Sequence, residues 1–182
     1  MQSITNGKFE QTIRVMPFHD SWMNTVTLVL GYTWFISGLD KILRTDFIVG
    51  FFNYVQYHMA QPTVFEWYKN VLSQYVLPHS IVIANCIQFT ELVIGAVLII
   101  GSLWNFFSDS RAIHYGLALA SGISFFLILN IILLQGSPFP WINPEQIFEE
   151  GVDLDFVVLF LSFFWTIANF IEARQEQTVI IS

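Results

Sequence analysis

The chain has 182 residues, of which 54% are hydrophobic and only 12% are charged, whereas a soluble domain has roughly 25% charged residues. With a mean hydropathy of +0.58, this balance indicates a membrane protein rather than a soluble domain. The net charge of −7, from 14 acidic and 7 basic residues, argues against nucleic acid as a partner, because phosphate binding needs clustered Lys and Arg. The single cysteine, Cys86, excludes an intrachain disulfide, a CxxC motif and a zinc site built from cysteines.

The first predicted membrane helix covers residues 22–41 and follows a polar lead-in over residues 1–20. Asp40 and Lys41 lie at the end of its apolar run. In one interpretation Asp40 is solvated and Lys41 extends its stem to the membrane surface. In the other, one of them turns inward and pairs with Glu91, because a buried pair costs far less than a buried lone charge.

The segment that follows is too polar and too aromatic to cross a membrane. A stripe recurs at every fourth residue, formed by Phe47, Phe51, Val55 and Met59. A Thr63-x-x-Glu66 capping-box spacing precedes a second stripe, formed by Val64, Tyr68, Val71 and Tyr75. We therefore predict two short amphipathic helices at the membrane surface, over residues 46–59 and 63–77, with their Tyr and Trp side chains at the level of the lipid headgroups.

The second predicted span, over residues 80–103, carries Glu91 about halfway along. An ionisable group at that depth costs several kcal/mol unless it faces a partner or a polar cavity. Glu91 is therefore either a carboxylate that handles protons or contacts a redox headgroup, or an acid that locks two helices together. Asn85 and Gln88 share its helical face, on which Gly95 allows another helix to approach closely.

The third predicted span covers residues 112–134 and carries Asn130, whose amide requires a hydrogen-bond partner. The sequence favours a hydrogen bond between helices, and the alternative is that Asn130 faces the same cavity as Glu91. Residues 135–153 form an acidic loop with three prolines, in which Asn143-Pro144 is typical of a helix start. The fourth span covers residues 154–172, and a polar, loose tail is expected over residues 173–182.

Four spans predict one all-α domain, an integral membrane four-helix bundle with interfacial amphipathic helices between the first and second spans. An even number of spans places both termini on one side of the membrane. That side holds four bases and the other side three, which favours cytoplasmic termini in a multi-pass protein of the cell membrane. The bases on the side of the termini are Lys8, Arg14, Arg111 and Arg174, and the others are Lys41, Arg44 and Lys69.

The histidines do not form a pair with the spacing of a metal site, so no metal site is predicted. His79 lies at the mouth of the second span, and His58 lies in the preceding amphipathic segment. They could share a site on one side of the membrane, although surface or capping roles are the favoured interpretation.

Two segments resemble the DoxD/DoxX family of membrane proteins. Gly31–Leu43 is similar to that family's first signature, a glycine-bearing helix that ends in Gly-x-x-Lys. Val76–Leu103 is similar to its second signature, a Leu-Pro followed by a Glu and two spaced glycines, which here are Pro78, Glu91, Gly95 and Gly101. The resemblance covers about residues 25–172 and implies a four-helix membrane protein.

The DoxD resemblance also implies a function, the small subunit of a thiosulfate:quinone oxidoreductase. That enzyme joins two thiosulfates to tetrathionate and passes the electrons to a membrane quinone, and the usual partner is a DoxA-like chain. On this hypothesis a quinone is the cofactor and the site has two groups of residues. The catalytic group is Glu91, Lys41 and Asp40, and the quinone-contacting group is Gln88, Asn85, Asn130 and His79.

The alternative is a non-catalytic subunit that stabilises a larger respiratory or electron-transfer complex in the membrane. In that case the buried polar residues serve only to hold helices together. The sequence leaves open whether the chain takes part in catalysis.

Overall fold

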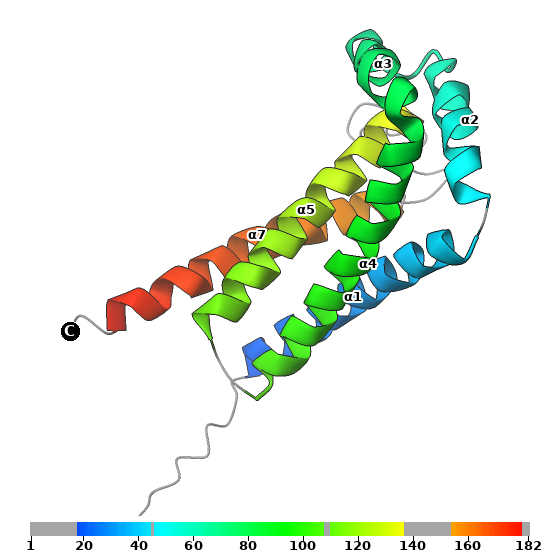
Figure 1. The fold of residues 1–182 in the computed structure, drawn as a ribbon. Coiled ribbons are helices and arrows are strands. Elements are labelled where there is room, and N and C mark those ends of the chain that lie inside the picture. The colour runs from blue at the N-terminus through cyan, green and yellow to red at the C-terminus, as the bar shows by residue number, and fades with distance from the viewer. Residues whose placement is uncertain (1–17, 45, 108–109, 137–153, 180–182) are drawn as a thin grey trace, which may run out of the picture.

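The computed structural model describes residues 18–44, 46–107, 110–136 and 154–179 (Figure 1). Within these ranges the chain is helical and contains no strand. The helices are α1 (Phe18–Leu43), α2 (Phe47–Met59), α3 (Glu66–Val71), α4 (Ser80–Asn105), α5 (Arg111–Gln135) and α7 (Leu154–Val179). A π turn over Leu72–Val76 and a 3-10 turn over Leu77–His79 join α3 to α4.

The structure confirms the predicted all-α architecture. Four helices, α1, α4, α5 and α7, are long and apolar enough to cross a membrane, and they coincide with the four predicted spans. Helix α7 continues to Val179, beyond the predicted end at residue 172, because the polar residues that follow are mostly strong helix formers. The lead-in before Phe18 and the loop over residues 137–153, including the predicted helix start at Asn143-Pro144, lie outside the described residues.

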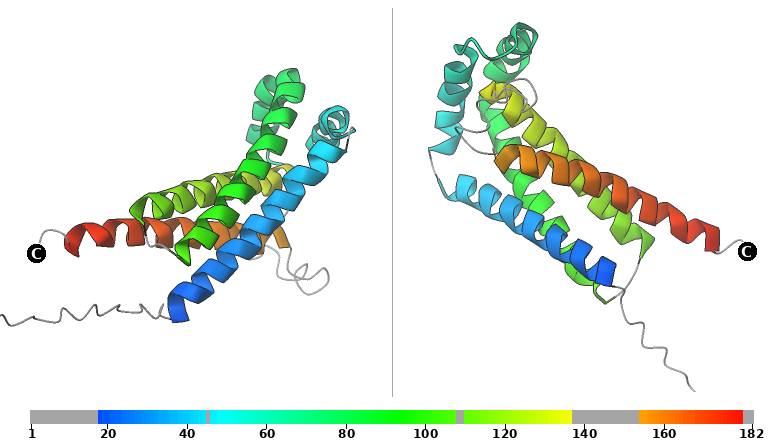
Figure 2. Two further views of the ribbon diagram at one scale, coloured as in Figure 1. Left: turned by 60° about the horizontal axis from the view of Figure 1, so that its bottom comes forward. Right: turned by 180° about the vertical axis from the view of Figure 1, so that it is seen from behind.

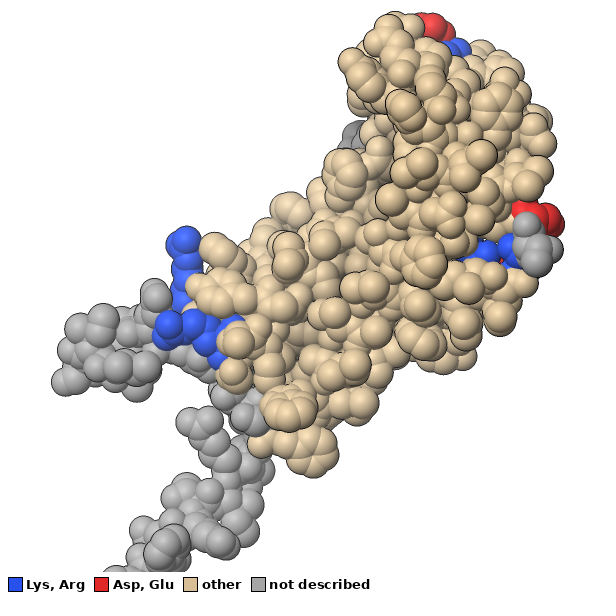
Figure 3. Space-filling view, viewed as in Figure 1, with Lys and Arg blue, Asp and Glu red and all other residues tan. Residues whose placement is uncertain are grey.

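The surface of the molecule fits a membrane environment. Figure 3 shows acidic and basic side chains gathered at the ends of the molecule, with a wide uncharged band between them on the face in view. Large apolar side chains are exposed along the spanning helices, among them Val29, Phe89, Val93, Ile123, Phe126, Phe160 and Phe164. Such a surface would be unfavourable in water and is favourable against lipid.

Helices α1 and α4 pack antiparallel along a seam of glycines. A Cβ atom added to Gly38 would lie 2.5 Å from the backbone nitrogen of Leu92, and one added to Gly95 would lie 2.5 Å from Cα of Phe35. The two backbones can be this close only because both glycines lack a side chain. The close approach predicted at Gly95 is therefore confirmed, and α1 is the helix that makes it.

The register of this seam shows where α1 stops. Gly38 lies against Leu92, so Leu43, five residues further along α1, falls level with Ile87, five residues back along α4. The first two turns of α4 consequently extend beyond α1. The chain turns after Arg44, and α2 continues along that part of α4 (Figures 1 and 2).

Helices α2 and α3 form a second small core against the end of α5. Its buried residues are Val55, Val64, Tyr68, Leu72 and Leu134. The bounds of α2 and its apolar stripe agree with the prediction, but the second stripe differs beyond Tyr68, because Val71 and Tyr75 are exposed and Leu72 is buried. The π turn after α3 contains more residues per turn than an α-helix, so the buried face moves on by one residue. The position of α2 and α3 at a membrane surface stays a prediction.

Candidate functional site

Glu91 is paired with a lysine inside the bundle. The Lys41 Nζ atom lies 2.6 Å from Oε2 of Glu91, and Ser37 donates a hydrogen bond of 2.9 Å to the same oxygen. Lys41 also donates to the Ser37 hydroxyl at 2.8 Å. Ser37 and Lys41 are one turn apart on α1, so they share the face that the glycine seam holds against α4.

Burial differs sharply between the two charges. The Glu91 side chain is 1% exposed, whereas that of Lys41 is 24% exposed. The pair neutralises both groups where an isolated carboxylate would be costly. Lys41 lies in the last turn of α1, where the helix dipole also favours a positive charge. The interpretation in which Lys41 turns inward to Glu91 is therefore confirmed.

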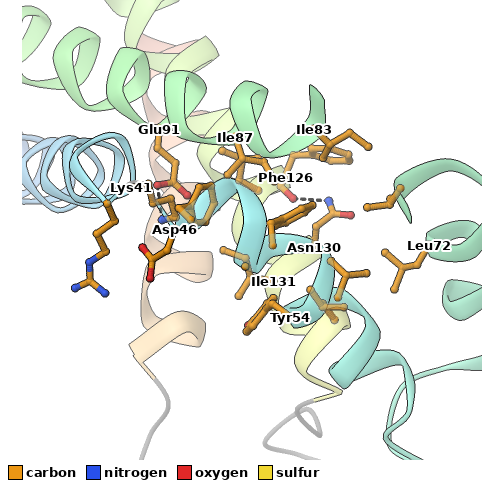
Figure 4. Close-up of a pocket in the computed structure, with 18 of the residues that line it drawn as sticks. Lys41, Asp46, Tyr54, Leu72, Ile83, Ile87, Glu91, Phe126, Asn130 and Ile131 are labelled. Carbon is orange, nitrogen blue, oxygen red and sulfur yellow. Dashed lines mark hydrogen bonds and ion pairs between the residues drawn. The ribbon is translucent and has the colours of Figure 1, made fainter. Parts of the chain in front are cut away.

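The pair lies at one end of a cavity of about 660 Å³. This volume falls within the range of small-molecule sites, roughly 300–1,000 Å³. The end of α1 and parts of α2, α3, α4 and α5 surround the cavity, and most of its wall is apolar (Figure 4). The apolar lining includes Phe47, Phe51, Val55, Leu72, Val76, Ile83, Ile87, Phe126, Leu127, Ile131 and Leu134.

A second polar group lies in the same cavity, away from Lys41. Asn130 projects from α5 and donates through Nδ2 to the carbonyl oxygen of Phe126 at 2.7 Å (Figure 4). The buried hydroxyl of Tyr68, on α3, lies 3.1 Å from Oδ1 of Asn130 and 3.2 Å from its carbonyl oxygen. Asn130 thus satisfies both interpretations, because it bonds another helix and also lines the cavity with Glu91.

The Tyr68 hydroxyl provides a test of this link between α3 and α5. Replacing Tyr68 by phenylalanine is expected to lower the free energy of unfolding by about 1 kcal/mol, because it removes one partly buried hydrogen bond. Thermal unfolding in detergent measures the change. The matched control is Tyr75→Phe, at an exposed position, which is expected to leave the unfolding temperature unchanged. Equal effects of the two substitutions would contradict the hydrogen bond.

Four of the predicted site residues lie outside the cavity lining. Asp40 is exposed and accepts a hydrogen bond of 3.0 Å from Arg44. Gln88 is buried in the seam beside Gly38 and donates to Asn85 at 3.1 Å. His79 is exposed at the start of α4. Of the seven predicted residues, the structure therefore brings three together at the cavity, which are Lys41, Glu91 and Asn130.

The two histidines near this end of the molecule have separate surroundings. The ring of His58 packs against Tyr54 with a centroid distance of 4.4 Å, and its partial burial lowers the pKa of His58. No contact between His58 and His79 is found in the part of the chain that the structure describes. The described ranges also contain no group of three or more His, Cys, Asp or Glu residues placed to hold a metal ion.

Ser37 and Tyr68 are site residues that the sequence analysis missed. Ser37 stands one helical turn before Lys41, and this spacing is the signal that could have found it. The sequence predicts Tyr68 at the level of the lipid headgroups, because it is an aromatic residue in an amphipathic segment. The sequence contains no direct sign of its hydrogen bond to Asn130, 62 residues further along the chain.

Comparison of the chain with known protein families, with curated proteins and with solved structures finds no match. The site is therefore interpreted from its own chemistry.

Proposed function

We propose that this chain is a DoxD/DoxX-like membrane subunit of a quinone-linked oxidoreductase and that its cavity binds the quinone headgroup. One observation carries the proposal. Lys41 and Asn130 bring hydrogen-bond donors into a single cavity whose remaining wall is largely apolar.

The donors match the chemistry of a quinone. A quinone is a flat apolar ring with two carbonyl oxygens, which only accept hydrogen bonds. The Lys41 ammonium has three N–H donors, of which Ser37 and Glu91 take two, and the third can reach a ligand oxygen. The Asn130 amide has two N–H donors, and the carbonyl oxygen of Phe126 accepts a hydrogen bond from one of them. The side chains of Ile87, Phe126 and Ile131 would enclose the ring (Figure 4).

The charges at the cavity suit reduction of such a ligand. When bound, a quinone accepts two electrons and two protons and becomes a quinol. The Lys41 ammonium would stabilise negative charge on the nearer oxygen as the electrons arrive. Glu91 holds that ammonium in place through the ion pair of 2.6 Å. In the overall reaction two thiosulfates, one quinone and two protons give one tetrathionate and one quinol.

The proposed complex includes a second chain and a membrane. A DoxA-like chain would be the partner, and the complex would lie in the cell membrane with both termini of this chain in the cytoplasm. The count of bases supports this orientation, with four on the side of the termini and three on the other side.

The test is reduction of a water-soluble benzoquinone by thiosulfate, measured with the purified chain and its co-purified partners. We expect Glu91→Gln and Asn130→Leu each to lower the rate by roughly 100-fold, because the first removes the carboxylate that positions Lys41 and the second removes a hydrogen-bond donor to the ligand. Cys86→Ala is the control, because Cys86 is exposed on α4 and does not line the cavity. Thermal unfolding of each variant separates lost chemistry from lost structure.

A non-catalytic subunit is the second candidate function. It is favoured by the geometry at Glu91, where Ser37 and Lys41 already join α1 to α4 without any ligand. In that case no preparation reduces the quinone, and a larger membrane complex dissociates when this chain is deleted.

A further inference from the structure

We infer that the cavity takes up protons from one side of the membrane only, through the break between α1 and α2, with Lys41 passing them to the ligand. This inference rests on the proposed quinone reduction and adds the proton source. Two observations support the inference. Charged residues line the cavity on the Lys41 side of the pair, and a largely apolar layer lies on the other side of Glu91.

The first part of the geometry is a charged mouth at the break. Arg44 and Asp46, which flank the turn from α1 to α2, both line the cavity and are exposed. The side chain of Arg44 is 68% exposed. Figure 4 shows Asp46 at the same end of the cavity as Lys41 and Glu91. At this end of the cavity, exposure therefore decreases from Asp46 to the partly exposed Lys41 and then to the buried Glu91.

Among the residues that the structure describes, the charged groups at this end of the cavity come from three helices. Helix α4 contributes Glu91, the start of α2 contributes Asp46, and the end of α1 contributes the exposed Asp40–Arg44 pair. The lining from α3 and α5 adds the neutral groups of Tyr68 and Asn130. Asp46 lines the mouth of the cavity and, unlike Glu91, accepts no hydrogen bond from Lys41 among the described contacts. We therefore assign the collection of protons to Asp46.

The second part is an apolar layer on the other side of Glu91. Glu91 and Ser102, the next buried polar residue along α4, are separated by roughly 16 Å of helix, at 1.5 Å per residue. The buried side chains of this layer, all 5% exposed or less, are Leu30, Trp34, Ile94, Leu98, Leu117, Ala120, Ile128, Ile132, Phe156 and Leu159. The indole N–H of Trp34 only donates hydrogen bonds, so it is unsuited to relaying a proton.

The buried hydroxyls on that side of Glu91 are few and separate from the pair. Within the layer Ser124 and Ser162 bond each other at 2.8 Å and the Ser121 hydroxyl is without a hydrogen-bond partner among the described residues, and beyond the layer Ser102 donates to the carbonyl oxygen of Asn24 at 2.6 Å. His114 lies 3.3 Å from a carboxylate oxygen of Glu172, near the end of the molecule where α1 begins and α7 ends. In the described ranges no hydrogen bond joins these groups to Lys41 or Glu91. Protons from that end would have to cross the apolar layer.

The proton balance of the reaction follows this path. Each quinone takes two electrons from the oxidation of two thiosulfates, and each of its oxygens gains one proton. Lys41 gives up a proton to the nearer oxygen and regains one from solvent by way of Asp46. The reprotonated Lys41 then supplies the second proton, which reaches the farther oxygen through water in the cavity. Glu91 holds Lys41 in place.

The experiment places the chain and its co-purified partners in lipid vesicles, with one pH-sensitive dye trapped inside and an impermeant one outside. A Cys86→Ala, Asn53→Cys variant reports orientation, because Asn53 is exposed on α2 and its replacement reacts with an impermeant maleimide only from the side that α2 faces. Thiosulfate and a benzoquinone start the reaction. We expect the pH to rise in the compartment that faces α2.

Two results would contradict the inference, and they are distinguishable. A rise in pH on the side of the termini, with quinone reduction intact, would overturn the inference and leave the proposed function standing. Absence of quinone reduction would overturn the proposed function and the inference with it. Asp46→Asn supplies the second measurement, since it should slow reduction severalfold at alkaline pH and much less at acid pH. The control Glu66→Gln removes an acid from the same end of the molecule but outside the cavity and should leave the pH profile unchanged.

Discussion

Replacing Lys41 by methionine is expected to destabilise the protein by about 3–5 kcal/mol, the usual effect of removing one partner of a buried ion pair. The substitution leaves Glu91 buried without its base. Glu91→Gln should cost much less, because glutamine can still accept from Ser37 and the partly exposed Lys41 can extend to solvent. Thermal and denaturant unfolding in detergent micelles measures both variants.

The double variant Lys41→Met, Glu91→Gln tests the coupling. It should recover most of the stability lost in Lys41→Met, because no charge is then left buried. Lys69→Met is the control, since its partner Glu66 is 85% exposed and such pairs contribute about 0–1 kcal/mol. A double variant less stable than Lys41→Met would show that the two residues act independently.

Replacing Gly95 by alanine is the second large effect that we expect. The new Cβ would lie 2.5 Å from Cα of Phe35, and because that atom belongs to the backbone, α1 as a whole must move. Overpacking of this kind costs roughly 1–3 kcal/mol and sometimes more. The separation of α1 from α4 also draws Lys41 away from Glu91. The Gly95→Ala variant should therefore lose both thermal stability and quinone affinity.

The control for this prediction is another helical glycine. A Cβ at Gly116, in α5, would meet nothing within 4 Å. Gly116→Ala should thus leave quinone affinity unchanged and raise stability by up to about 1 kcal/mol, since alanine favours a helix. If both substitutions behaved alike, the seam would not depend on close backbone contact.

The sequence was sufficient to predict the four long helices and to identify Glu91 as an acid inside a span that requires a partner. Both predictions depend on local quantities, the length of an apolar run and the position of a charge within it. The choice between Asp40 and Lys41 depends on the direction of a helix face. Lys41 follows Ser37 by one turn and shares its face toward α4, whereas Asp40 shares a face with Arg44 and pairs with it in the open.

The cavity could not be predicted from the sequence, because it depends on where one helix stops beside another. It exists since α1 ends level with Ile87 and α2 covers the part of α4 that remains. The same limitation explains why Gln88, a predicted site residue, lies outside the cavity lining. It does share the helical face of Glu91, as predicted, but at that level the face is occupied by Gly38 of α1 rather than by the cavity.

The Lys41–Glu91 pair also constrains how the protein is made. The two residues are 50 positions apart, so α1 emerges from the ribosome well before α4. Lys41 is near the end of α1, so its ammonium can lie among the lipid headgroups until α4 is inserted. Glu91 is too far from either end of α4 to do so. Stable insertion of α4 therefore depends on α1 already being at hand to receive it, which makes the first helix an assembly template for the second span during biogenesis.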